Sequence, residues 1–112
     1  MEIQTTTGAG FTTLAVTGRL DARTAPAADS ALQGAIEAGA SRLVVNLAGL
    51  EYVSSAGLRV LLLTAKKLSR QNGKLVLCGM QPGVREVFAI SGMLSVFPNA
   101  ADEAAAQALA MG

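Results

Sequence analysis

The sequence of 112 residues contains no histidine, no tryptophan and a single cysteine. Histidine is the commonest general base near neutral pH, so its absence excludes a conventional Ser-His-Asp hydrolase. One cysteine cannot form an internal disulfide, and without histidine it does not supply the usual ligands of a zinc site. We therefore expect a protein that is not an enzyme and that carries no metal or cofactor.

Aromatic residues and charge are also scarce. Aromatic residues make up 4% of the chain and the net charge is +1, so neither base-stacking platforms nor a strong field for phosphate binding are expected. No apolar run reaches membrane-spanning length, and the N-terminus lacks the basic and apolar segments of a secretory signal. These features predict a cytoplasmic protein that binds no nucleic acid and does not insert into a membrane.

Hydrophobic residues are plentiful, at 51%, and in a chain of this length they predict a single domain over residues 1–112 with an ordinary core. The hydrophobic periodicity predicts an α/β fold, with a mixed sheet of four to five strands, its core strands parallel, and about four helices packed against it. The expected strands are 3–7, 11–17, 42–47, 74–80 and a short segment at 96–97, and the expected helices are 25–38, 55–72, 82–91 and 100–111.

Glycines and apolar residues add detail to these elements. Gly39, Gly73 and Gly92 are expected to end the first three helices. Ile90 is expected to face the core from the third helix, and Leu109 is expected to be the largest apolar anchor of the last one. Cys78 lies in a buried strand pattern and is expected to be a small core residue.

The pair Ser54-Ser55 marks the junction where a strand pattern gives way to helical spacing. The first N–H groups of a helix have no partner within the helix, so a hydroxyl is favoured as a cap and an anion is tolerated there. A cap needs one hydroxyl, which leaves the second serine free for another role. The small residues Ala56 and Gly57 follow, and they predict space for a close approach to the start of the helix.

Charged residues around this junction are the other candidates for binding. No acidic residue lies between Glu51 and Glu86, so the second helix is expected to present a basic outer face, either solvated or available to an acidic partner. Its basic residues are Arg59, Lys66, Lys67 and Arg70, with Lys74 beyond. Asp21 and Asn46 lie at the C-terminal ends of predicted strands, where open α/β sheets place ligand sites and where turns and caps also use such residues.

Five segments form a combined motif in a fixed order along the chain. They are Gly18-Arg19-Leu20-Asp21, Leu43-Val44-Val45-Asn46-Leu47, the stretch from Tyr52 to Leu61 that contains both serines, the stretch from Gly79 to Phe88, and Ile90-Ser91-Gly92-Met93. Together these segments resemble the STAS domain family, named for sulfate transporters and anti-sigma factor antagonists. The resemblance extends over nearly the whole chain and matches the small free-standing bacterial members.

The resemblance implies a partner-switching protein. Such an antagonist binds an anti-sigma factor that is also a serine kinase, is released when a serine at the start of the second helix is phosphorylated, and is reset by a serine phosphatase. The family motif places the phosphoacceptor on Ser55, whereas Ser54 stands where the family has an acidic residue and Asn46 where it often has aspartate. The implied partner-binding residues are Asp21, Ser54, Ser55, Ala56, Gly57, Leu58 and Arg59.

Three alternatives stay open at this point. Ser54 is an alternative acceptor, since it too carries a hydroxyl beside the helix start. The fold also suits a STAS scaffold subunit of a transport or signalling complex that is never phosphorylated. An enzyme using Ser55 with Lys66 or Lys67 as its base is disfavoured, because these lysines lie three helical turns from the serine.

Overall fold

The computed structural model describes all 112 residues as one mixed β-sheet with four helices. The strands are β1 (Glu2–Thr7), β2 (Thr12–Leu20), β3 (Arg42–Asn46), β4 (Leu50–Val53), β5 (Lys74–Cys78) and β6 (Asn99–Ala100). The helices are α1 (Ala25–Glu37), α2 (Ser55–Arg70), α3 (Pro82–Ile90) and α4 (Glu103–Met111). The predicted α/β class and four helices are confirmed.

The sheet is organised around β2, the longest strand. It pairs antiparallel with β1, and the main order of strands is β1-β2-β3-β5-β6, with β3, β5 and β6 parallel to β2. The first half of β2 pairs with β3, and its second half pairs with β4, which is also parallel to it. Six strands therefore form, where four to five were predicted. The prediction missed β4 because only its two end residues are buried, so it shows no alternating pattern.

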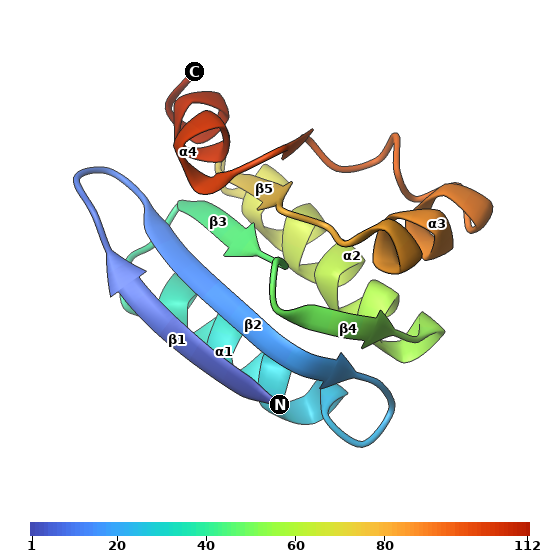
Figure 1. Cartoon of the computed structure of the whole chain (residues 1–112). Coiled ribbons are helices and arrows are strands. Elements are labelled where there is room, and N and C mark those ends of the chain that lie inside the picture. Colours follow the sequence, from blue (N-terminus) through green and yellow to red (C-terminus); the bar gives the residue numbers. More distant parts are fainter.

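Helices cover both faces of the sheet (Figure 1). On one face α1 and α2 enclose the main core, to which β3 and β5 contribute Leu43, Val45, Leu75 and Leu77. On the other face α4 packs against Val44, Val76 and Cys78, the alternate residues of the same two strands. β3 and β5 are therefore buried on both faces.

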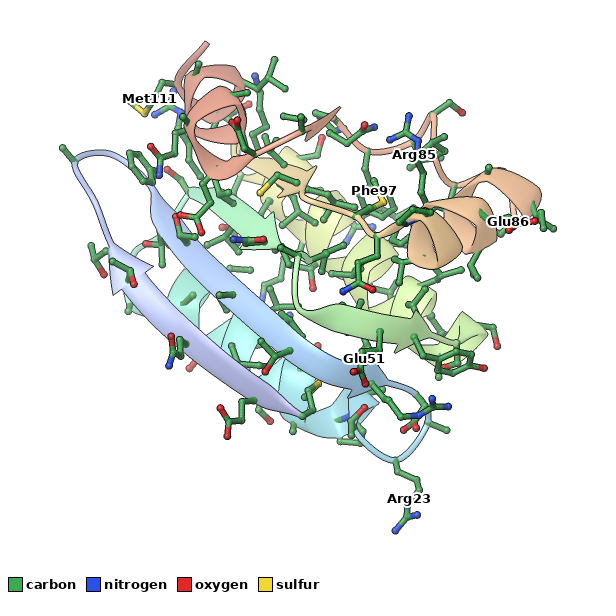
Figure 2. The ribbon with its side chains drawn as sticks, in the orientation of Figure 1. Arg23, Glu51, Arg85, Glu86, Phe97 and Met111 are labelled. Atoms are coloured by element: carbon green, nitrogen blue, oxygen red, sulfur yellow. The ribbon has the colours of Figure 1, made fainter.

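α3 lies beside β4 at one end of the sheet and is held by an aromatic pair. Phe88 of α3 and Phe97 of the following loop pack edge to face, with ring centroids 5.9 Å apart, and both are buried. Figure 2 shows Phe97 turned inward, while Arg85 and Glu86 extend outward from α3. Ile90 is 79% exposed, so its predicted place in the core is wrong.

Three predictions about helix and strand ends are corrected. α2 ends at Arg70, and the residue with a left-handed backbone is Asn72 (φ 60°), not Gly73. Gly73 is needed for close packing instead, because a Cβ there would lie 2.3 Å from the carbonyl oxygen of Ser41. The last strand is β6, which lies two residues beyond the predicted segment.

α4 is shorter than predicted and is anchored by different residues. It begins at Glu103, where Asp102 caps its N-terminus by accepting a hydrogen bond from the N–H of Ala105 at 2.9 Å. Leu109 is 43% exposed, whereas Ala106 and Ala110 are buried against the sheet. Small residues suit this face because the valines and the cysteine of β3 and β5 already fill the space beneath the helix.

Candidate functional site

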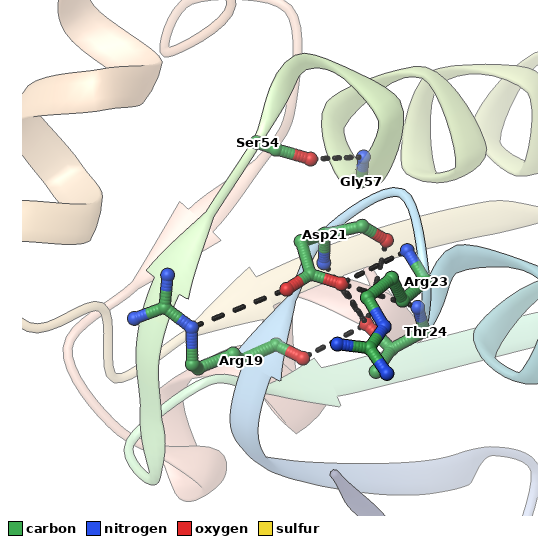
Figure 3. Close-up of polar contacts among 6 residues, drawn as sticks. All are labelled: Arg19, Asp21, Arg23, Thr24, Ser54 and Gly57. Carbon is green, nitrogen blue, oxygen red and sulfur yellow. Dashed lines mark hydrogen bonds and ion pairs between the residues drawn. The ribbon is translucent and has the colours of Figure 1, made fainter.

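The candidate site lies at the edge of the sheet where β2 and β4 end side by side. These strands are parallel, with Leu20 in register with Val53, and the N–H of Ser54 donates a hydrogen bond to the carbonyl oxygen of Leu20 at 2.9 Å. Asp21 and Ser54, which follow the two strands, therefore emerge at the same edge, as Figure 3 shows. The structure thus brings together two segments that are more than thirty residues apart in the sequence.

The two serines occupy different positions at the start of α2. Ser54 is the N-cap, with extended backbone angles (φ −98°, ψ 175°), and its hydroxyl oxygen accepts a hydrogen bond from the N–H of Gly57 at 3.4 Å. Ser55 is the first residue of the helix and is exposed to solvent. The predicted cap is confirmed for Ser54, and the side chain of Ser55 is accessible at the surface.

Gly57 is buried, and its lack of a side chain is needed within the protein itself. A Cβ on Gly57 would lie 2.6 Å from Cγ of Leu20 and 3.0 Å from the carbonyl oxygen of the same residue. The prediction that Gly57 leaves space for a partner is therefore wrong, because the end of β2 fills that space. Leu58 is 6% exposed and belongs to the core, so both residues position α2.

A shallow groove runs beside Ser55, between the first half of α2 and the loop that follows α3. Its volume is about 450 Å³, and its lining is largely apolar apart from two serines and one arginine. The lining residues are Ser55, Ala56, Leu58, Arg59, Leu62, Ser91 and Met93. The groove therefore brings together four of the predicted partner-binding residues, Ser55, Ala56, Leu58 and Arg59.

Sequence reasoning missed the far wall of this groove. Ser91 and Met93 belong to a motif that resembles the family, but nothing in that motif indicates which part of α2 it faces. Leu62 has the helical spacing of a core residue, and it is only partly buried because it lies at the groove. Contacts between segments so far apart in sequence depend on how α3 packs beside β4.

Asp21 closes the turn between β2 and α1. Its carboxylate accepts hydrogen bonds from the N–H groups of Arg23 at 3.0 Å and Thr24 at 3.2 Å, and Nε of Arg19 lies 4.0 Å away. Burial acts to raise the pKa of Asp21, but these two N–H donors, the hydroxyl of Thr24 and the charge of Arg19 outweigh it, so the pKa lies below its ordinary value. Arg19 also stacks over the ring of Tyr52, at 4.3 Å from the centroid. Asp21 is thus an ionised group held beside the start of α2.

Asn46 lies away from this site and joins the sheet to α4. Its Nδ2 donates to Oε2 of Glu103 at 2.5 Å, and its Oδ1 accepts from the N–H of Ala48 at 2.9 Å. An aspartate here could not donate to Glu103 and would place a second negative charge beside it. The amide of Asn46 can therefore donate a hydrogen bond to Glu103 at the start of α4, which an aspartate could not do.

The basic residues predicted to form the outer face of α2 fall into two groups, those bonded to other elements and those exposed to solvent. Nζ of Lys67 donates to Oε1 of Gln33 on α1, and Nζ of Lys74 donates to the carbonyl oxygen of Leu109 at 3.0 Å. Arg59, Lys66 and Arg70 are exposed, and of these only Arg59 lines the groove beside Ser55.

Two further features of the structure concern metal ligands and membrane-spanning segments. Three or more carboxylate or thiol groups do not gather anywhere in the arrangement that a metal ion would need. None of the four helices combines the length and the apolar character needed to cross a bilayer. The site offers an exposed hydroxyl, a shallow groove and two charges of opposite sign.

Comparison with known proteins places these features in context. Residues 1–106 match the family described as the STAS domain. A protein of Bordetella bronchiseptica named as an anti-sigma factor antagonist, BtrV, is 47% identical over 91 residues, which cover 81% of this chain and 78% of that protein. An anti-sigma-B factor antagonist of Staphylococcus aureus is 30% identical over 93 residues, covering 83% of this chain and 86% of that protein.

Solved structures agree in fold. The crystal structure of an anti-sigma factor antagonist from Mycobacterium paratuberculosis superposes with a TM-score of 0.90 at 24% identity, covering 99% of this chain and 94% of the other. At this level of identity the likeness concerns the fold alone.

Proposed function

Because the chain belongs to the STAS domain family, we propose that it is an anti-sigma factor antagonist that works by partner switching. In this proposal the unphosphorylated protein binds an anti-sigma factor that is also a serine kinase. Phosphorylation of Ser55 releases that partner, and a serine phosphatase restores binding. The relatives named as antagonists support the proposal, as does the Bacillus protein SpoIIAA, a fold neighbour whose structures include a phosphorylated form.

The observation that carries the proposal is the division of roles between the two serines. Ser54 caps α2, while Ser55 holds its hydroxyl at the exposed first position of the same helix. Phosphorylation of Ser55 therefore leaves the cap intact. This arrangement favours Ser55 over Ser54 as the acceptor.

The position of Ser55 also explains how a phosphate could act without unfolding the protein. A phosphoserine carries about −1.5 to −2 charges at pH 7, and the free N–H groups and dipole of a helix N-terminus stabilise a negative charge there by about 0.3–1 kcal/mol. The same charge in a docked interface would have to be desolvated without a partner. A loss of about 1.4 kcal/mol weakens binding tenfold, and burying an unpaired charge costs more than that.

The surface proposed for docking is the groove beside Ser55 together with the flanking charges. Leu62 and Met93 offer apolar area within the groove, Arg59 offers a positive charge and Asp21 a negative one. Gly57 and Leu58 act indirectly, since they hold α2 against β2 and the core.

Kinase labelling tests the choice of acceptor. The native protein, Ser55→Ala and Ser54→Ala are incubated with the cognate anti-sigma kinase and labelled ATP. We expect the native protein and Ser54→Ala to be labelled and Ser55→Ala to remain unlabelled. Equal labelling of Ser55→Ala would refute the assignment.

A scaffold role without phosphorylation would give another result. Protein purified from its native cell would then carry no phosphate on Ser54 or Ser55, and subunits of a transport or signalling complex would be captured with it. The same purification, followed by mass spectrometry, decides between the two functions.

A further inference from the structure

Arg59 is the one charged residue that lines the groove beside Ser55. It lies four residues after Ser55 on α2, and both side chains are exposed. Residues four apart on a helix are neighbours, with Cβ atoms about 5–6 Å apart, and a pair with the negative group nearer the N-terminus is the favourable orientation. Arg59 is therefore placed to meet any negative charge carried by Ser55.

We propose that a phosphate on Ser55 is held by the guanidinium of Arg59, in an ion pair within α2 that we call the phosphate latch. The inference rests on the proposed phosphorylation of Ser55 and adds what the phosphate contacts. A guanidinium can donate two parallel hydrogen bonds to a phosphate, which makes this pair stronger than a contact between simple charges. The partly buried Leu62 and Met93 border the same groove, so the pair would lie beside apolar side chains.

The other charged groups near the start of α2 are less suited to this role. Arg19 is engaged by the carboxylate of Asp21 and by the ring of Tyr52. Arg23 extends away from the protein into solvent, as Figure 2 shows. The loop after α3 contributes only the uncharged Ser91 and Met93 to the groove, and Asp21 would repel a phosphate.

The latch has a consequence for docking. Without the phosphate, the guanidinium of Arg59 is available to an acidic group of a partner that enters the groove. With the phosphate, the same guanidinium is paired within α2. Phosphorylation would thus change the groove in two ways, because it adds negative charge at Ser55 and withdraws the positive charge of Arg59.

A phosphorus NMR titration tests the latch. Phosphoserine is placed at position 55 by genetic encoding, so that no kinase is needed, and its second pKa is measured in the native background, in Arg59→Gln and in Arg70→Gln. Arg70→Gln is the matched control because it removes the same charge from the same helix, at a position about 22 Å along the helix axis from Ser55. That distance exceeds the screening length of about 8 Å at physiological salt.

We expect Arg59→Gln to raise the second pKa of the phosphoserine by about 0.5, a threefold change in proton affinity, and Arg70→Gln to leave it unchanged. Arg59→Lys, which keeps the charge but loses the two-pronged geometry, should give a smaller increase. Equal values in Arg59→Gln and Arg70→Gln would overturn the latch. Because the phosphate is installed without a kinase, that result is independent of whether a kinase modifies Ser55.

Discussion

At the scale of single residues, the start of α2 separates two chemically identical side chains by position. Ser54 stabilises the helix through its hydrogen bond to the N–H of Gly57, whereas Ser55 is exposed. We expect Ser54→Ala to lower the free energy of unfolding by about 1 kcal/mol and Ser55→Ala to change it by less than about 0.5 kcal/mol. Urea unfolding of both variants measures the difference. A larger loss in Ser55→Ala than in Ser54→Ala would reverse the assigned roles.

Cys78 is a second residue whose environment predicts its chemistry. Burial, with the nearby negative charges of Glu103 and Asp102, raises the pKa of its thiol from 9.0 to about 11. The thiol should therefore stay unreactive towards a thiol reagent at pH 8 and react promptly once denaturant unfolds the protein. Because the pKa is higher in the folded state, this group favours folding below about pH 9, and its contribution is lost as the pH rises towards 11. Rapid labelling of the folded protein would contradict the placement of Cys78.

At the scale of elements, the contact between α2 and β2 depends on a glycine within the helix. Alanine in place of glycine normally stabilises a helix by about 1 kcal/mol, but a Cβ at Gly57 would collide with Leu20. We expect Gly57→Ala to destabilise the protein by about 1–2 kcal/mol. Gly34 of α1 is the matched control, since its Cβ position has no neighbouring atom within 4 Å, and Gly34→Ala should be stabilising by about 0.5–1 kcal/mol. Stabilisation by both substitutions would show that α2 and β2 are less closely packed.

The contact between β3 and α4 depends on a pairing of amide with carboxylate. Asn46→Asp would place two carboxylates together in a half-buried site. We expect this substitution to lower the free energy of unfolding by about 1–2 kcal/mol at pH 7. Repulsion between the two carboxylates raises the pKa of one of them in the folded state. The destabilisation by Asn46→Asp should therefore become smaller as the pH falls through this raised pKa, because one carboxyl is then neutral. Urea unfolding between about pH 4.5 and pH 7.5, the approximate range in which perturbed carboxyl groups titrate, measures this dependence.

The double variant Asn46→Asp with Glu103→Gln is the control for this prediction. In this variant the amide of the new glutamine donates and the carboxylate of the new aspartate accepts, so one donor again faces one acceptor. The variant should recover most of the stability at pH 7. A loss in Asn46→Asp that does not depend on pH would mean that the charge of Glu103 plays no part.

Elements with strong periodicity were predictable from the sequence, and elements defined by their neighbours were not. α1 is an example, because its five buried residues have the helical spacing that predicts a helix over residues 25–38. They are Ala25, Ala28, Leu32, Ala35 and Ile36. The strand β4 was missed because four residues with an exposed centre carry no periodic signal. Leu109 was a poor guide to α4 because the close approach of that helix to the sheet favours alanine over larger residues.

At the scale of the whole molecule, the site is assembled from three parts of the chain. The turn after β2 supplies Asp21, the start of α2 supplies Ser55 and Arg59, and the loop after α3 supplies the far wall of the groove. The serine junction was predictable, because caps and changes of periodicity are local signals. The groove was not, because it depends on where the packing of Phe88 and Phe97 places α3 and its loop.

We therefore propose a rigid switch, in which charge at one exposed position changes binding while the fold stays the same. The cap of Ser54, the packing of Gly57 against Leu20 and the core position of Leu58 all hold the start of α2 independently of Ser55. A modification of Ser55 should then act on the partner and leave the domain folded.

The most direct test compares the affinity of the cognate anti-sigma kinase for the unphosphorylated protein and for protein carrying phosphoserine at position 55, by isothermal titration calorimetry. Thermal unfolding of both forms is followed in parallel. We predict binding at least about tenfold weaker for the phosphorylated form, with an unfolding temperature that changes by no more than about 4 °C, the shift that corresponds to about 1 kcal/mol. Equal affinity of the two forms, or a loss of binding that accompanies unfolding of the phosphorylated protein, would contradict the account.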